Sequence, residues 1–199
     1  MELSHPEETE DMKEMLDREI REHVGRLGCG AVLLARDILQ DPNFIATMVL
    51  ICIYSKEGGT YGLVLNRPSH MPLSEMFDGF SELHEPRKIY IGGPVQQEEL
   101  QIIQITDDPV ADSHKLSRRV YLGGKWEDVE QMLMLDADAA RLFLGYSGWA
   151  EGQLEGEIAA GAWDVFDKLD LEKLLLNIDR TVGSDVKHIA QYLESIRAS

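Results

Sequence analysis

The residues best suited to chemistry gather in one stretch, GYSGWAEGQLEGEIAAGAW, which runs from Gly145 to Trp163. Its Ser147 is framed almost like a hydrolase nucleophile. A nucleophile elbow has the pattern G-x-S-x-G, because both glycines let the backbone turn sharply beneath the serine. Here Trp149 occupies the second glycine position, where its side chain would crowd the turn. We therefore interpret Ser147 as a small structural residue, although sequence order alone leaves His188 open as a base.

The same stretch holds three carboxylates, Glu151, Glu155 and Glu157. Glu151 and Glu155 lie one helical turn apart, so they could perform acid-base chemistry or hold a divalent cation. An exposed acidic helix face explains them equally well, since the helix dipole favours glutamate near an N-terminus. We favour the helix-face interpretation.

Two glycines bracket Trp149, which suggests a joint where a strand turns sharply into a helix. Gln153 and Glu155 follow directly and could hydrogen-bond the backbone groups exposed at that joint. Trp163 closes the far end of the stretch. The pattern predicts either a tight corner locked by two large rings or the floor of a pocket, and it favours the corner.

Paired glycines elsewhere are candidates for phosphate binding. Gly92 and Gly93 stand in GGPV, and a second pair lies in LGGK at 122–125. Neither segment matches a P-loop or a dinucleotide-binding fingerprint. Backbone amides in such turns could form an anion nest, but a Gly-Gly pair before proline is more typical of a turn that ends a strand.

Metal and cofactor motifs are not visible in the sequence. The six histidines do not approach ligand spacing with one another, and the two cysteines, Cys29 and Cys52, are too few for a zinc site or a disulfide framework. We predict two reduced structural thiols, no metal and no cofactor.

The elements that position these residues begin after an acidic extension. Residues 1–25 carry nine acidic and three basic side chains, and we expect the first eight residues to be disordered. From Thr9 an amphipathic helix is predicted, with a stripe formed by Met12, Met15, Leu16, Ile20 and Val24. This helix would dock on the body or on a partner, and a solvated helix with one apolar stripe is the simpler interpretation.

Residues 26–199 are predicted to form one globular domain. Apolar, β-branched runs indicate buried strands at GAVLLA and TMVLICIY, and Gly58–Gly59 indicates a hairpin into YGLVLN. Further strands are expected at KIYIGGPV, LQIIQI, RRVYLGG and RLFLGYSGW.

Helical spacing predicts the remaining elements. We expect a short helix at 73–77, then helices beginning at Trp126, after Trp149, at Leu171 and at Val186, the last capped by Ser184. The predicted fold class is α+β: a single compact domain with a mixed, mainly antiparallel β-sheet core surrounded by helices.

Composition restricts the partners. A net charge of −17 repels phosphate backbones and anionic membrane surfaces, so we expect no direct nucleic-acid or membrane binding. The longest apolar run, 45–54, is about half a membrane span, and the acidic N-terminus does not look like a secretory signal. A cytoplasmic protein is the simplest expectation.

Four motifs, in order, resemble the AlgH/YqgE family of bacterial proteins. They are GxLLAxxxLxDPxF at 30–44, GLVLNRP at 62–68, GGPV at 92–95 and GYSGWxxGQLExEIxxGxW at 145–163. The resemblance implies one compact α+β domain and an activity that is not established, in a family whose members are often labelled transcriptional regulators. It carries over no catalytic residue. The acidic extension and a serine at position 147, where the family pattern has alanine, are departures from it.

Three functions follow from these patterns. The first is a non-enzymatic binding or regulatory protein that contacts an unidentified protein or small molecule. The alternative is an enzyme with carboxylate chemistry in a pocket of Asn66, Arg67, Trp149, Gln153 and Glu155. The third treats the N-terminal helix as a partner mimic or an oligomer arm. The candidate ligand or interface residues are Asn66, Arg67, Gly92, Gly93, Tyr146, Trp149, Gln153 and Glu155.

Overall fold

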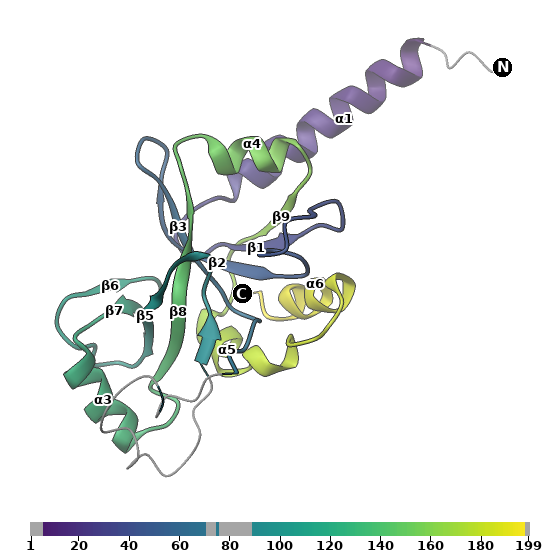
Figure 1. The fold of residues 1–199 in the computed structure, drawn as a ribbon. Helices are drawn as coiled ribbons and strands as arrows, with labels where there is room; N and C mark the ends of the chain where they lie inside the picture. The colour runs from purple at the N-terminus through teal and green to yellow at the C-terminus, as the bar shows by residue number, and fades with distance from the viewer. Residues whose placement is uncertain (1–5, 71–74, 76–88, 198–199) are drawn as a thin grey trace.

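In the described part of the chain, a strongly curved sheet of nine strands lies at the centre (Figure 1). The computed structural model describes residues 6–70, 75 and 89–197. The strands are β1 (Val32–Ala35), β2 (Met48–Ser55), β3 (Gly59–Val64), β4 (Ile89–Ile91), β5 (Val95–Ile105), β6 (Ser113–Lys115), β7 (Val120–Gly123), β8 (Ala140–Trp149) and β9 (Trp163–Phe166). The helices are α1 (Pro6–Gly25), α3 (Trp126–Leu135), α4 (Gln153–Ala159), α5 (Leu171–Leu176), the 3-10 helix η2 (Ile178–Arg180) and α6 (Val186–Ser195).

The strand β8 joins the two parts of the sheet. The strand order is β6-β7-β5-β8-β3-β2-β1-β9, and these neighbours pair antiparallel. The first half of β8 pairs with β5 on one edge and, in parallel, with β4 on the other. Its last three residues pair with β3. Both β4 and β3 therefore share one edge of β8, and the chain that leaves β4 must cross β8 to reach β5.

Three glycines make this crossing sterically feasible. The N–H of Gly92 donates to Leu144 O (2.8 Å), while its carbonyl accepts from Val64 N (2.8 Å), so Gly92 bridges β8 and β3. A Cβ on Gly93 would lie 2.2 Å from the carbonyl carbon of Tyr146, and one on Gly145 would lie 2.7 Å from Val95 O. Because real Cβ atoms do not approach so closely, only glycine fits where the two chains touch.

Three apolar clusters stabilise the sheet. Helices α5 and α6 cover one face, where Leu174 and Ile189 are fully buried against the strands. Helix α4 covers the other face of β1, β2 and β9, and α3 packs on β5 and β8 through Val129. Coverage of both faces explains why β2 begins as an uninterrupted buried run instead of alternating with polar residues.

Helix α1 is anchored at its C-terminal end and extends away from the body at its N-terminal end (Figure 1). Val24 packs against the cluster beneath α4. His23 Nδ1 accepts the N–H of Val165 (3.0 Å), and Arg26 donates to Val165 O (3.3 Å). Since β9 is at the end of the sheet, these side chains satisfy backbone groups on an open edge.

The predicted fold class is confirmed, and so is the antiparallel hairpin of β2 and β3. Three local predictions are wrong or lie outside the described residues. KIYIGGPV is not one strand, because Gly92–Pro94 separates β4 from β5. Asp185, not Ser184, caps α6 by accepting the N–H of His188 (2.8 Å). Trp163, at the far end of the 145–163 stretch, is the first residue of β9. The helix expected at 73–77 lies largely outside the described residues.

Among the described helices, none combines the length and apolar character that crossing a bilayer requires.

The crossing yields a direct test. Gly93→Ala places a methyl group against the β8 backbone, so we expect the free energy of unfolding to fall by about 3 kcal/mol or the protein to be insoluble. Gly156→Ala in α4 is the control, since a Cβ there meets nothing within 4 Å. It should leave stability unchanged or raise it by up to about 1 kcal/mol. Urea unfolding of both variants measures the difference, and equal stabilities would refute the close crossing.

Candidate functional site

The loop before β2, residues 41–47, is held by the two polar residues of the NRP motif. Asn66 is buried; its Oδ1 accepts the N–H of Met48 (3.0 Å) and its Nδ2 donates to Ala46 O (3.0 Å). Arg67 donates to Asn43 O (2.6 Å) and Ile45 O (3.4 Å). The DPxF and NRP motifs therefore form one unit, in which side chains of the second bind the backbone of the first.

Phe44 at the tip of this loop packs against both tryptophans of the 145–163 stretch. Its ring centroid lies 5.9 Å from Trp149 and 5.5 Å from Trp163, and the two indoles meet edge to face at 6.1 Å. Trp149 and Trp163 are almost completely buried in the cluster beneath α4. The three rings connect β8, β9 and the 41–47 loop.

One carboxylate, Glu157 on α4, binds both tryptophans. Its Oε2 accepts the indole N–H of Trp149 (3.0 Å) and of Trp163 (2.8 Å). Its Oε1 accepts from Gln153 Nε2 (3.1 Å), and Gln153 Oε1 accepts the N–H of Ala150 (3.0 Å). The buried indoles thus have hydrogen-bond partners, and the turn into α4 is fixed from both sides.

Glu155 points in a different direction. Its Oε1 accepts from the Tyr54 hydroxyl (2.7 Å), which ties α4 to the end of β2. Burial, and then the bond to Glu155, raise the pKa of the Tyr54 phenol to about 12. The phenol therefore remains a proton donor at neutral pH.

Ser147 and the glycine pair belong to the crossing of β8. Ser147 is fully buried, and its Oγ donates to Gly92 O (3.1 Å). His188 lies on α6, where its Nδ1 is 2.8 Å from Asp185 Oδ2. The Ser147 hydroxyl is thus committed to a backbone carbonyl, in agreement with its interpretation as a small structural residue.

Tyr146 lies on the opposite side of β8 from Ser147, because successive side chains of a strand alternate. Its ring stacks on Tyr61 at 4.8 Å, and the Tyr61 hydroxyl donates to Gln101 Oε1 (2.6 Å). Burial raises the pKa of the Tyr61 phenol, with a smaller contribution from Cys52. A surface groove of about 470 Å³ begins at Tyr61 and runs past Leu122.

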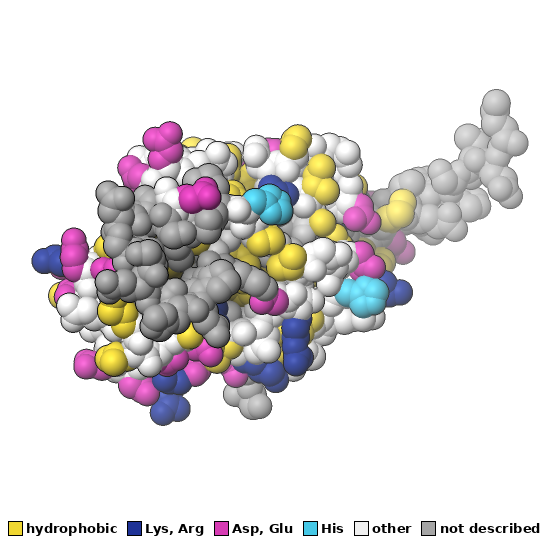
Figure 2. Space-filling model, turned by 60° about the horizontal axis from the view of Figure 1, so that its bottom comes forward, with side chains coloured by type: hydrophobic (Ala, Val, Ile, Leu, Met, Phe, Trp, Pro, Cys, Tyr) yellow, Lys and Arg dark blue, Asp and Glu magenta, His cyan; other side chains and the backbone are white. Residues whose placement is uncertain are grey.

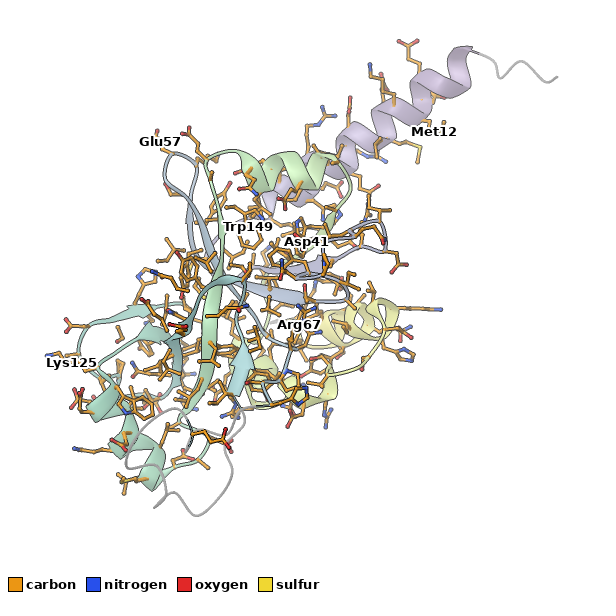
Figure 3. The ribbon with its side chains drawn as sticks, viewed as in Figure 1. Met12, Asp41, Glu57, Arg67, Lys125 and Trp149 are labelled. Atoms are coloured by element: carbon orange, nitrogen blue, oxygen red, sulfur yellow. The ribbon has the colours of Figure 1, made fainter. Side chains whose placement is uncertain are left out.

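The structure joins most of the predicted site residues through contacts but does not aim their polar atoms at one point. Asn66 and Arg67 face the 41–47 loop, Gln153 faces Glu157, and Glu155 faces Tyr54. Figure 3 shows Trp149 near α4, whereas Arg67 lies farther from that helix. The sequence pattern did not single out Glu157, although its place between two tryptophans was a usable signal.

A candidate metal site lies where α1 meets β9. One ligand atom each from Glu19, His23 and Asp164 fall within 4.8 Å of one another. However, Arg36 donates to both carboxylates, at 2.7 Å to Glu19 and 2.8 Å to Asp164. His23 Nδ1 accepts the N–H of Val165, so a neutral ring carries its proton on Nε2, the atom that faces the acids. A cation would compete with Arg36 and need that proton removed, and we interpret the cluster as the ion-pair anchor of α1.

Comparison with known proteins decides the family. Residues 32–182 match the family model described as AlgH-like. The chain belongs to the AlgH-like family. A UPF0301 protein of Chlorobaculum tepidum is 35% identical over 141 residues, which are 69% of this chain and 74% of the relative. A UPF0301 protein of Cytophaga hutchinsonii is 30% identical over 175 residues, 82% of this chain and 94% of the relative.

Two solved structures are similar to this AlgH-like chain. The solution structure of the AlgH protein from Pseudomonas aeruginosa has a TM-score of 0.65 at 22% identity, over 99% of this chain and 94% of that one. The crystal structure of protein DIP2367 from Corynebacterium diphtheriae has a TM-score of 0.60 at 26% identity, over 73% and 78% of the two chains. The first similarity establishes the fold. The AlgH-like match begins at Val32, so α1 lies before it.

The shared carboxylate yields a second test. Glu157→Ala removes the acceptor of both indole N–H groups, and we expect the free energy of unfolding to fall by about 2–4 kcal/mol with a red shift of tryptophan fluorescence. Glu151→Ala, which removes an exposed carboxylate just before α4, should change stability by less than about 0.5 kcal/mol. Matching unfolding curves for the two variants would contradict the assigned role of Glu157.

Proposed function

We propose that this AlgH-like protein is a non-catalytic binding protein that acts through contacts with another protein or a small molecule. One observation carries the proposal: the main polar side chains of the motifs at 62–68 and 145–163 bind other groups of the same chain. Ser147 donates to Gly92 O, Asn66 and Arg67 hold the 41–47 loop, and Glu157 accepts from two indoles. Groups used in this way build a scaffold and are not available to a substrate.

Charge supports a regulatory role through proteins and not through DNA. The net charge is −17, and on the face shown in Figure 2 the lysine and arginine side chains stand in small groups among acidic ones. A DNA-binding surface needs a basic stripe that follows the phosphates. We place this activity in the cytoplasm, where cysteines such as Cys29 and Cys52 stay reduced.

The alternative is an enzyme that uses the pocket predicted around Asn66, Arg67, Trp149, Gln153 and Glu155. The pair of Glu155 and Tyr54 is the observation that favours it, because a carboxylate and a phenol at 2.7 Å can exchange a proton with a substrate. Because the pKa of the Tyr54 phenol is about 12, the phenol keeps its proton at neutral pH and could donate it to a substrate.

A thermal-shift screen of metabolites and nucleotides separates the two functions. A ligand that binds only the folded state raises the melting temperature, by the equivalent of about 2.7 kcal/mol at 100 times its Kd. We expect such a ligand to be recovered unchanged after incubation, by mass spectrometry. Conversion of the ligand that is lost in Glu155→Gln but kept in Glu151→Gln would establish the enzyme instead.

The charge argument has its own test. We expect filter binding at low salt to show no specific affinity for DNA fragments, because the acidic surface repels the phosphate backbone. A basic DNA-binding domain of similar size serves as the positive control. Submicromolar binding that distinguishes one sequence from another would overturn the protein-mediated role.

A further inference from the structure

We propose that the exposed apolar face of α1, formed by Met12, Met15 and Leu16, binds a basic amphipathic helix of a partner protein. This inference rests on the proposed binding function and names the class of partner. It concerns a part of the chain that precedes the AlgH-like match and takes no part in the four motifs.

The three side chains form a continuous stripe. They stand at i, i+3 and i+4, the spacing that places residues on one face of a helix. Met12 is 65% exposed, Met15 62% and Leu16 53%. Figure 3 shows Met12 projecting from the part of α1 that extends beyond the body. Large apolar side chains grouped in this way are typical of an interaction surface.

The stripe continues a contact that already exists. Farther along the same helix, Ile20 and Val24 are half-buried, and Val24 packs on the cluster beneath α4. Helix α1 contacts α4 and β9, and Figure 1 shows its N-terminal part extending beyond the body, so the apolar face passes from a covered to an uncovered region. A helix laid along α1 would extend the same packing.

The charge of α1 favours a basic partner helix on its exposed apolar face. Residues 6–22 contain eight acidic and three basic side chains. Two surface hollows of about 360 and 530 Å³ adjoin Met15, and acidic side chains outnumber arginines in both. The larger is lined by Asp11, Glu14 and Asp17 together with Arg18 and Arg21. Two copies of α1 would bring like charges together along their contact, which is unfavourable. A helix with lysine or arginine beside its apolar stripe has the complementary charge.

The anchor of α1 prepares this surface for binding. Arg36 joins Glu19 to Asp164, and His23 and Arg26 bind the backbone of β9. The helix is therefore held at one end and presents its free end already folded, which lowers the ordering cost of association. Methionine side chains adapt their shape to different apolar partners, as two of the three positions here would allow.

The experiment uses the full chain and a fluorescein-labelled peptide of about 20 residues, with leucine at helical spacing and lysine elsewhere. A second peptide replaces each lysine by glutamate. The test variant carries Met12→Ser, Met15→Ser and Leu16→Ser. The matched control carries Met134→Ser and Leu135→Ser on α3, where the native side chains are 54% and 91% exposed. Far-UV circular dichroism verifies that both variants are folded, and fluorescence anisotropy measures Kd.

We expect the basic peptide to bind at least about tenfold more tightly than the acidic one, and the α1 variant to lose about tenfold or more in affinity while the α3 variant keeps it. Equal binding by both variants overturns the proposal, because it reveals only a general attraction to an acidic surface. A wild-type dimer that dissociates in the α1 variant, without peptide binding, also overturns it by making a second copy the occupant. Neither result affects the proposed binding function, which the ligand screen and the DNA-binding assay test separately.

Discussion

The crossing of residues 91–95 over β8 is the contact on which the rest of the fold depends. It takes the chain from the β3 and β4 edge of β8 to the β5 edge, so both parts of the sheet share one central strand. Gly92 joins β3 to β8 through its own N–H and carbonyl, and Ser147 donates to the same carbonyl. Side chains larger than hydrogen at Gly93 or Gly145 would separate the two chains and break these bonds.

The same strand contributes Trp149 to the cluster of three rings formed with Phe44 and Trp163. Beyond the crossing, β8 ends at Trp149, and α4 turns back so that Glu157 reaches both indoles. Phe44 packs against both rings, on a loop whose backbone accepts hydrogen bonds from Asn66 and Arg67. The motifs at 62–68, 92–95 and 145–163 thus take part in one contact network that starts at the crossing and ends at β9. This arrangement supports the proposal that the protein binds its partner through a surface outside the motifs, the exposed face of α1.

Local patterns sufficed for much of the fold. The Gly58–Gly59 turn predicts the β2–β3 hairpin, and the alternation of apolar runs and helical stripes predicts the α+β class, because both signals lie within a few neighbouring residues. Local patterns could not predict the crossing, because it brings Gly92 next to Ser147, which is 55 positions away in the sequence. The role of Glu157 also depends on where β9 returns, because Trp163 approaches it only after the fold has formed. Ser184 and Asp185 are neighbouring residues that can both cap a helix, and the backbone geometry decides between them.

Native-state hydrogen exchange tests the central claim most directly, by measuring the opening free energy at the backbone amides of Val64 and Gly92, which the crossing holds. If the crossing locks the sheet together, these two amides exchange only through global unfolding, with opening free energies equal to the stability from denaturation. Exchange at either amide through a local opening that costs several kcal/mol less than global unfolding would contradict the account, because the two parts of the sheet would then separate while the rest of the protein stays folded.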